Sequence, residues 1–126
     1  MTIEDPVRYV EGIWDWGILK GCFGDTRIEP TDVDGIVERN GHFLLLEAKA
    51  PGVPVKQGQW WTFNALRNTG CFTIIIVWGQ TNAPEAMQVL YPPPLAAGPK
   101  KQADLNDLRN VVSWWFARVN QKRRVS

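Results

Sequence analysis

The sequence predicts an α/β fold, in which a mixed β-sheet made of an antiparallel hairpin and a βαβ crossover is flanked by helices. Asn40-Gly41, the strongest short-range hairpin signal, separates two β-type runs. A helical stretch then leads into residues 72–78, a β-branched run typical of a strand buried on both faces. We expect the order α-β-β-α-β-(β)-α in a single domain over residues 1–126, with its core in 3–91.

The first part of the chain carries a predicted helix and the hairpin. Apolar residues recur at helical spacing over residues 3–19, and Thr2 with Asp5 fits a capping box before them. The hairpin strands are expected over 33–39 and 42–48.

The second part supplies the crossover and a last helix. A helix is expected over 56–68 and the buried strand over 72–78, so the crossover should be right-handed and its two strands parallel. An edge strand is expected over 87–91, followed by a Pro/Ala/Gly connector over 92–99. Residues 104–120 then predict the C-terminal helix.

The net charge of the chain bears on whether it binds nucleic acid. Net charge is +1, so a generally basic surface does not indicate nucleic acid, and any such binding must come from local clusters. The alternative for each cluster is a solvated loop or tail. The clusters are Lys100 with Lys101, and Lys122, Arg123 and Arg124 near the C-terminus.

Cysteine and apolar content exclude other classes. Cys22, Cys71 and His42 have no zinc-ligand spacing. No apolar run reaches the ~18 residues of a membrane span, and we see no signal peptide, so we expect a cytoplasmic protein with no membrane partner.

The hairpin brings acidic residues together. A two-residue turn places Asp34 opposite Glu47 and Asp32 opposite Lys49. Side chains alternate faces along a strand, so all four leave the same face. The alternative is an exposed face with a salt bridge between Asp32 and Lys49. The apolar run Leu-Leu-Leu directly before Glu47 argues against that alternative, because charges that end a buried strand usually have a function.

Two facing carboxylates favour a cation. Opposed Cβ atoms lie about 4.5–5.5 Å apart, so Asp34 and Glu47 repel unless one is protonated or a cation lies between them. Mg²⁺ binds through one or two carboxylates, waters and a substrate phosphate, and Mn²⁺ is the other candidate. The Ala48 carbonyl is a further candidate ligand. Lys49 can polarise a water or stabilise charge that develops on a phosphate.

Helical residues extend this candidate site. Gln59 begins an apolar stripe of the second predicted helix, where it can hydrogen-bond Lys49, a metal-bound water or a phosphate; the alternative is a partly exposed helix start. Glu11 is a possible accessory acid, as is Asp32, although a solvated helix charge is the stronger interpretation of Glu11. Two basic residues of the same helical region are candidate nucleic-acid contacts, Lys56 and Arg67.

The order Asp34, then Glu47-Ala48-Lys49 in an apolar strand, then Gln59 resembles the PD-(D/E)XK nuclease superfamily, and most closely its virus-type replication-repair nuclease (VRR-NUC) group. The resemblance covers residues 31–78. It implies a restriction-endonuclease-like fold in which Asp34 and Glu47 bind the metal, Lys49 assists hydrolysis and Gln59 completes the site.

The sequence departs from the family pattern at three points. Val33 replaces the proline before the aspartate, Gly58 replaces the glutamate before the glutamine, and Asp32 adds a second aspartate. The ligand choice between Asp32 and Asp34 therefore rests on the hairpin register, which favours Asp34. By the same resemblance, stand-alone members tend to be two-fold dimers that cut branched DNA.

The leading hypothesis is thus a metal-dependent DNA endonuclease, acting on branched or junction DNA and forming a homodimer. One alternative is a nucleic-acid- or protein-binding module that has lost catalysis. Another is a non-catalytic assembly subunit that uses its aromatic surface. Seven tryptophans are more than one small core needs, and a core together with a dimer interface explains them better than base stacking does.

Overall fold

The computed structural model describes residues 14–121. The chain divides into two compact units, Met1–Thr31 and Asp32–Ser126, and each is described by itself. In the first unit, the short 3-10 helix η1 (Trp16–Leu19) begins after Asp15, whose Oδ1 accepts a hydrogen bond from the Gly17 N–H at 2.8 Å.

The helix expected over residues 3–19 is only partly testable. Residues 3–13 of it lie outside the described part, and at 16–19 the expectation of an α-helix is wrong. Asp15 starts a new turn there by capping Gly17, and glycine is a poor helix former.

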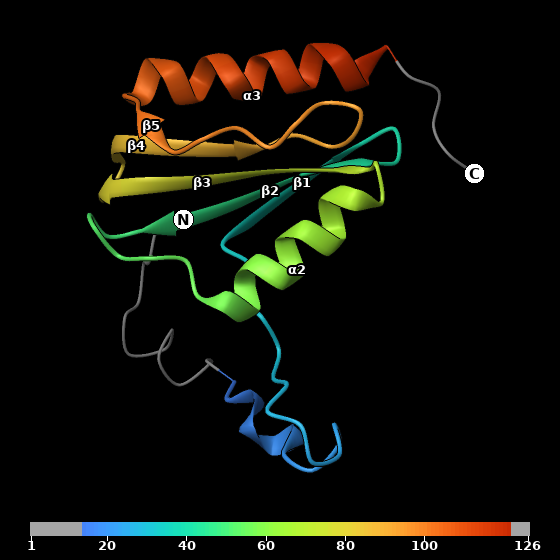
Figure 1. Ribbon diagram of the computed structural model, residues 1–126. Helices are drawn as coiled ribbons and strands as arrows, with labels where there is room; N and C mark the ends of the chain where they lie inside the picture. Colours follow the sequence, from blue (N-terminus) through green and yellow to red (C-terminus); the bar gives the residue numbers. More distant parts are fainter. Residues whose placement is uncertain (1–13, 122–126) are drawn as a thin grey trace. The chain divides into compact units, whose positions relative to one another are not determined.

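The second unit is an α/β structure with a five-stranded mixed sheet, which confirms the predicted class (Figure 1). The strand order is β1-β2-β3-β4-β5; β2 and β3 run parallel, and the other neighbours are antiparallel. The strands are β1 (Gly35–Arg39), β2 (His42–Lys49), β3 (Phe72–Gln80), β4 (Ala83–Leu90) and β5 (Lys101–Gln102). The helices are α2 (Gln57–Asn68) and α3 (Leu105–Asn120).

The hairpin has the predicted register. Asn40 and Gly41 have φ values of 52° and 80°, as a two-residue type I′ turn requires, and Arg39 pairs with His42. The ladder ends at the pair Gly35 and Leu46, so β1 is two residues shorter than expected. Asp34 therefore lies just before the strand, beside the last three residues of β2.

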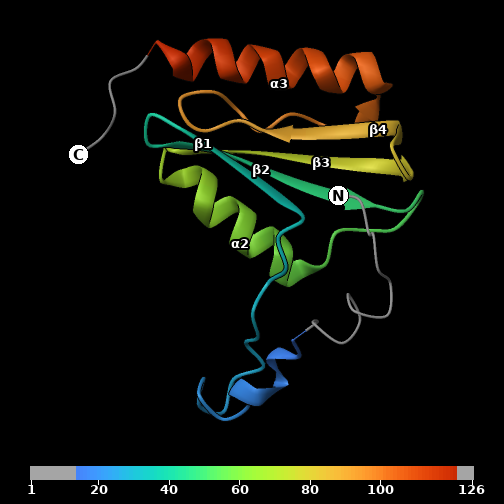
Figure 2. The same cartoon turned by 180° about the vertical axis from the view of Figure 1, so that it is seen from behind.

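The two helices cover opposite faces of the sheet (Figures 1 and 2). On one face, Leu45 and Ile74 pack in a core with Phe63 of α2. On the other, Leu44 and Ile75 pack with Trp115 of α3. Because side chains alternate along β2, the face that carries Leu45 also carries Glu47 and Lys49. We call it the α2 face.

The strand expected at the edge, over 87–91, is longer and is not the edge, so this part of the prediction is wrong. β4 covers Ala83–Leu90, and β5 pairs with it. The connector also returns to β4, through a bridge between Leu90 and Ala97. A two-residue strand has no periodic pattern, so the sequence does not reveal β5.

The C-terminal helix is present as expected, and it closes onto the hairpin. Asp104 and Asp107 form a reciprocal capping box at its start. At its end, Asn120 Oδ1 accepts a hydrogen bond from Arg39 Nε at 2.7 Å, and the Val119 carbonyl accepts one from Asn40 Nδ2 at 3.1 Å. Within residues 14–121, neither α2 nor α3 nor any other helix has the length and apolar character of a membrane span.

Candidate active site

The predicted acidic site lies where the two parallel strands end and α2 begins. Glu47 and Lys49 belong to the last three residues of β2, Gln59 lies in the first turn of α2, and Asp34 is the residue before β1. This is the carboxyl edge of the parallel pair, the usual position of ligands in sheets with crossover connections. The structure thus brings the four residues of the predicted set together.

Glu47 is the centre of the site. It is 6% exposed, and its Oε1 accepts a hydrogen bond from Gln59 Nε2 at 3.1 Å and lies 3.4 Å from Lys49 Nζ. Its other oxygen, Oε2, is buried and has no hydrogen-bond partner among residues 14–121. A buried carboxylate oxygen without a partner is costly, and a bound cation or water removes that cost.

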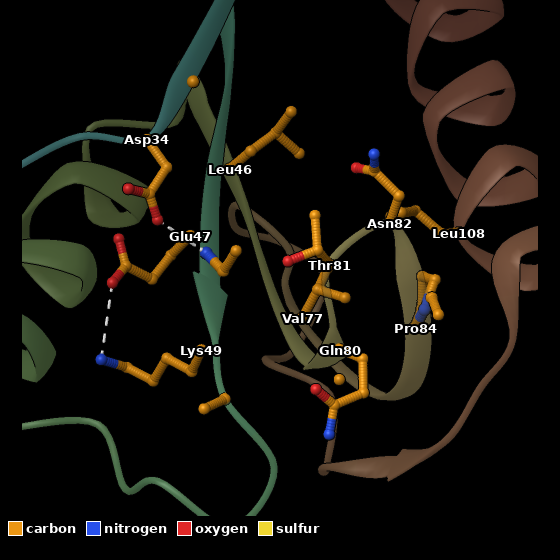
Figure 3. A pocket seen from close by; sticks show the side chains of 15 residues that line it. Asp34, Leu46, Glu47, Lys49, Val77, Gln80, Thr81, Asn82, Pro84 and Leu108 are labelled. Atoms are coloured by element: carbon orange, nitrogen blue, oxygen red, sulfur yellow. Dashed lines mark hydrogen bonds and ion pairs between the residues drawn. The ribbon is translucent and has the colours of Figure 1, made fainter. Parts of the chain in front are cut away.

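Asp34 completes the acidic pair. Figure 3 shows its carboxylate and that of Glu47 on the same side of β2, turned toward each other. One oxygen of Asp34, Oδ2, accepts a hydrogen bond from the Ala48 N–H at 2.8 Å. This side-chain oxygen replaces the main-chain carbonyl that a longer β1 would offer to the same N–H. The N–H and C=O of a strand residue point to the same edge, so the Ala48 carbonyl is on the side of Asp34.

The local charges raise the pKa of the Glu47 carboxyl above its ordinary value. Burial is the largest cause, and the nearby Asp34 carboxylate adds to it. Gln59 and Lys49 act in the opposite direction, by a hydrogen bond and by positive charge, without cancelling the increase. In the absence of a cation, the charged form of Glu47 is therefore destabilised in the folded protein.

These residues fit a hard divalent cation. Two carboxylates and one main-chain carbonyl are all oxygen donors, and the unpartnered Glu47 Oε2 is an available ligand. Within residues 14–121, no three His, Cys, Asp or Glu side chains cluster as a metal site. A set of two carboxylates matches Mg²⁺, which keeps several waters, better than it matches zinc.

We expect Glu47→Gln to make the metal-free protein more stable than wild type near neutral pH. A raised folded-state pKa means that the stabilising contribution of Glu47 is complete below its ordinary pKa and is lost as pH rises through the raised value. Urea unfolding in EDTA at several pH values measures this: the difference from wild type should vanish at acidic pH. Exposed Glu85→Gln is the control. A Glu47→Gln effect that does not change with pH would contradict the expectation.

Gln59 orients the glutamate. Its Nε2 donates to Glu47, and its Oε1 accepts from the Lys56 N–H at 3.3 Å, so both ends of the amide are fixed. Lys49 pairs with Glu47 and not with Asp32, so the salt bridge of the alternative interpretation is not formed. Asp32 lies before β1, is exposed, and has no place in the strand ladder.

The remaining candidates are separate from this cluster or lie outside the described residues. Lys56 is the exposed N-cap of α2. Arg67, near the other end of α2, donates to the Tyr91 carbonyl at 2.6 Å and to the Leu95 carbonyl at 2.9 Å, so its guanidinium anchors a loop. The candidates outside the described residues are Glu11, Lys122, Arg123 and Arg124.

A cavity of about 600 Å³ adjoins the site across β2. Figure 3 shows Leu46, Val77 and Leu108 on its α3 side, opposite the carboxylates. The residues of the β3–β4 turn that line this cavity were not predicted from the sequence, because β4 was expected to begin only at residue 87. The one local signal is Gly79, where a Cβ would collide with the Ala83 carbonyl, so the two strands require glycine at their closest approach.

Comparison of the chain with models of protein families, with curated proteins and with solved structures found no significant match. The function of the chain is therefore inferred from the geometry of the site and from the resemblance of its motif.

Proposed function

We propose that this protein is a metal-dependent endonuclease that hydrolyses DNA phosphodiester bonds, with a restriction-endonuclease-like fold of the PD-(D/E)XK superfamily and closest to its VRR-NUC group. The observation that carries the proposal is the buried Glu47 carboxylate, whose Oε2 has no partner while Asp34, Lys49 and Gln59 surround it. The ion pair with Lys49 engages only Oε1, which leaves Oε2 free to bind a cation.

The roles follow from the contacts. Asp34, Glu47 and the Ala48 carbonyl would hold Mg²⁺ or Mn²⁺, which when bound polarises a phosphate oxygen and makes a nearby water more acidic. Lys49 Nζ, 3.4 Å from Glu47 Oε1, is placed to stabilise the negative charge that develops on the phosphate. In hydrolysis a water loses a proton as its oxygen bonds to phosphorus, the bond from phosphorus to a sugar oxygen breaks, and that sugar oxygen gains a proton. Lys49 can hold or deliver this proton.

The choice of DNA substrate depends on contacts outside the metal site. A net charge of +1 gives little general attraction for long duplexes, so local contacts must select the substrate. The motif resemblance favours branched or junction DNA. The test is a panel of labelled linear, nicked, flapped and four-way DNA incubated with Mg²⁺, Mn²⁺ or EDTA. Metal-dependent cuts support the proposal, and binding without any cleavage would instead identify an inactive binding module.

We also propose that the protein acts as a homodimer. Large aromatic side chains remain exposed on both helices of the second unit, with Trp61 at 69%, Trp114 at 41% and Phe116 at 47%. Large aromatic side chains are enriched at protein interfaces relative to the rest of a protein surface. Light scattering at assay concentration should give about twice the chain mass of 14.3 kDa. A mass equal to one chain would contradict the dimer without affecting the site.

A further inference from the structure

The ammonium group of Lys100 packs against a tryptophan ring. Lys100 Nζ lies 4.0 Å from the centroid of the Trp78 ring. Trp78 is 4% exposed, and its Nε1 donates a hydrogen bond to the Val53 carbonyl at 2.6 Å. Burial and this hydrogen bond fix the position of the indole. A cation over the face of the ring is attracted by the ring quadrupole. This contact restricts where the Lys100 charge can lie.

The sheet pairing shows that Lys100 is on the same face as the site. Lys49 of β2 pairs with Trp78 of β3, which pairs with Ala86 of β4, which pairs with Gln102 of β5. Trp78 and Ala86 both pack in the core under α2, so this cross-strand row is on the α2 face. The next residue, Lys101, pairs with Met87, which packs in the core under α3.

Lys100 precedes Lys101, and side chains alternate along an extended chain. Lys100 therefore shares the α2 face with Gln102, in agreement with its contact to Trp78. Lys100 Nζ therefore reaches past β4 to the ring of a β3 residue. Because Trp78 is the β3 partner of Lys49, the ring contact holds the Lys100 ammonium group against the residue that neighbours Lys49 across the sheet.

The charge of Lys100 is available to a ligand. Lys100 is exposed, and among residues 14–121 it makes no ion pair with a carboxylate. Its ring contact leaves ammonium hydrogens directed away from the ring. An unneutralised cation on the same face as the proposed phosphate-cleaving site is suited to hold another phosphate of the same strand, because each strand of a duplex carries one phosphate for about every 3.4 Å of helix axis.

We propose that Lys100, positioned by Trp78, binds a backbone phosphate of the nucleic acid next to the phosphate held at Glu47 and Lys49. This inference rests on the proposed nuclease function and names a contact that the motif does not contain. Lys100 acts as a positioning residue, since it touches a phosphate that does not react. Its contribution should therefore appear in substrate binding and in KM, and not in kcat.

The test compares two adjacent lysines that face opposite sides of the sheet. Lys100→Met removes the charge and keeps a stem over Trp78, Lys100→Arg keeps the charge, and Lys101→Met is the matched control. Binding of a fluorescent DNA duplex is titrated in EDTA, where no cleavage takes place, at several NaCl concentrations. Cleavage of the same DNA in Mg²⁺ gives kcat and KM, and thermal melting reports folding.

We expect Lys100→Met to raise Kd about fivefold or more and to reduce the slope of log K against log salt by about 0.9, the amount for one phosphate contact. KM should rise with kcat unchanged, and Lys100→Arg should stay near wild type. Lys101→Met should keep the wild-type slope. Equal effects of Lys100→Met and Lys101→Met would overturn the inference, as would a Lys100→Met variant that melts lower but keeps the wild-type slope.

The same experiment separates this inference from the proposed function. Wild-type protein that cleaves DNA, together with a Lys100→Met variant equal to the control, overturns the inference alone. Wild-type protein that binds DNA but never cleaves it overturns the nuclease proposal, and the salt slopes still decide the role of Lys100. Wild-type protein that neither binds nor cleaves overturns both.

Discussion

Glu47→Ala and Asp34→Ala should each abolish metal-dependent cleavage, because each removes a carboxylate from the pair that would hold the cation. Glu47 supplies the unpartnered buried oxygen, and Asp34 is the acid facing it across the end of the hairpin. Mg²⁺ is usually bound through only one or two carboxylates, so losing either should also weaken binding of the metal itself. Purified variants are assayed on one DNA substrate across a Mg²⁺ titration, and metal binding is measured separately by calorimetry.

Two controls make this result specific to the site. Asp34→Asn retains an oxygen that can accept the Ala48 N–H, so it separates loss of the charge from loss of the strand-end hydrogen bond. Asp32→Ala removes an exposed acid two residues away and should cost less than Asp34→Ala. Full activity in Asp34→Ala or Glu47→Ala would end the assignment. An inactive Asp32→Ala beside an active Asp34→Ala would move the ligand to Asp32.

Lys49→Ala should lower kcat by about 10²-fold or more, the usual scale for losing a charge-stabilising or proton-transfer group. The affinity for the metal should be largely unchanged. The Lys49 side chain is 9% exposed and its ammonium group pairs with Glu47 through Oε1, so the other carboxylate oxygen stays available to a cation. Single-turnover cleavage at saturating Mg²⁺ measures the chemical step directly.

The loss of activity in Gln59→Ala should be compared with that in Lys49→Ala. Gln59 reaches the site through a hydrogen bond to Glu47 and would not hold the metal, so its loss should cost less than that of Lys49. A Lys49→Ala variant with an unchanged rate at saturating metal would show that Lys49 only neutralises Glu47 in the folded protein. A larger loss in Gln59→Ala than in Lys49→Ala would reverse the assigned roles.

The sequence was sufficient to predict the hairpin and the acidic cluster because local rules determine both. Asn40-Gly41 accepts positive φ at both positions, so it determines the turn, and the turn determines which residues face each other. Once Glu47 is placed in β2, alternation puts Lys49 on the same face and the short crossover brings the start of α2 above it. Each of these steps uses residues that are close in the chain.

The features that the sequence did not reveal depend on contacts between distant segments. β5 exists because residues 101–102 find the edge of β4, and two residues carry no periodic signal. The ring contact of Lys100 joins a residue just before β5 to one in β3, and no motif encodes this meeting of distant segments. The early end of β1 also has a specific cause, since the side chain of Asp34 takes the N–H that another strand residue would have paired.

The closure of α3 onto the hairpin turn has a consequence for local unfolding. Arg39 and Asn40 bond to Asn120 and to the Val119 carbonyl, which lie about eighty positions further along the chain. Releasing the last turn of α3 therefore frees the hairpin turn, and the two segments should exchange their amide hydrogens as one cooperative unit. The amides of α2, which packs on the other face, can remain protected during that opening. Bringing such distant segments together is entropically expensive, so this unit is expected to be completed late in folding.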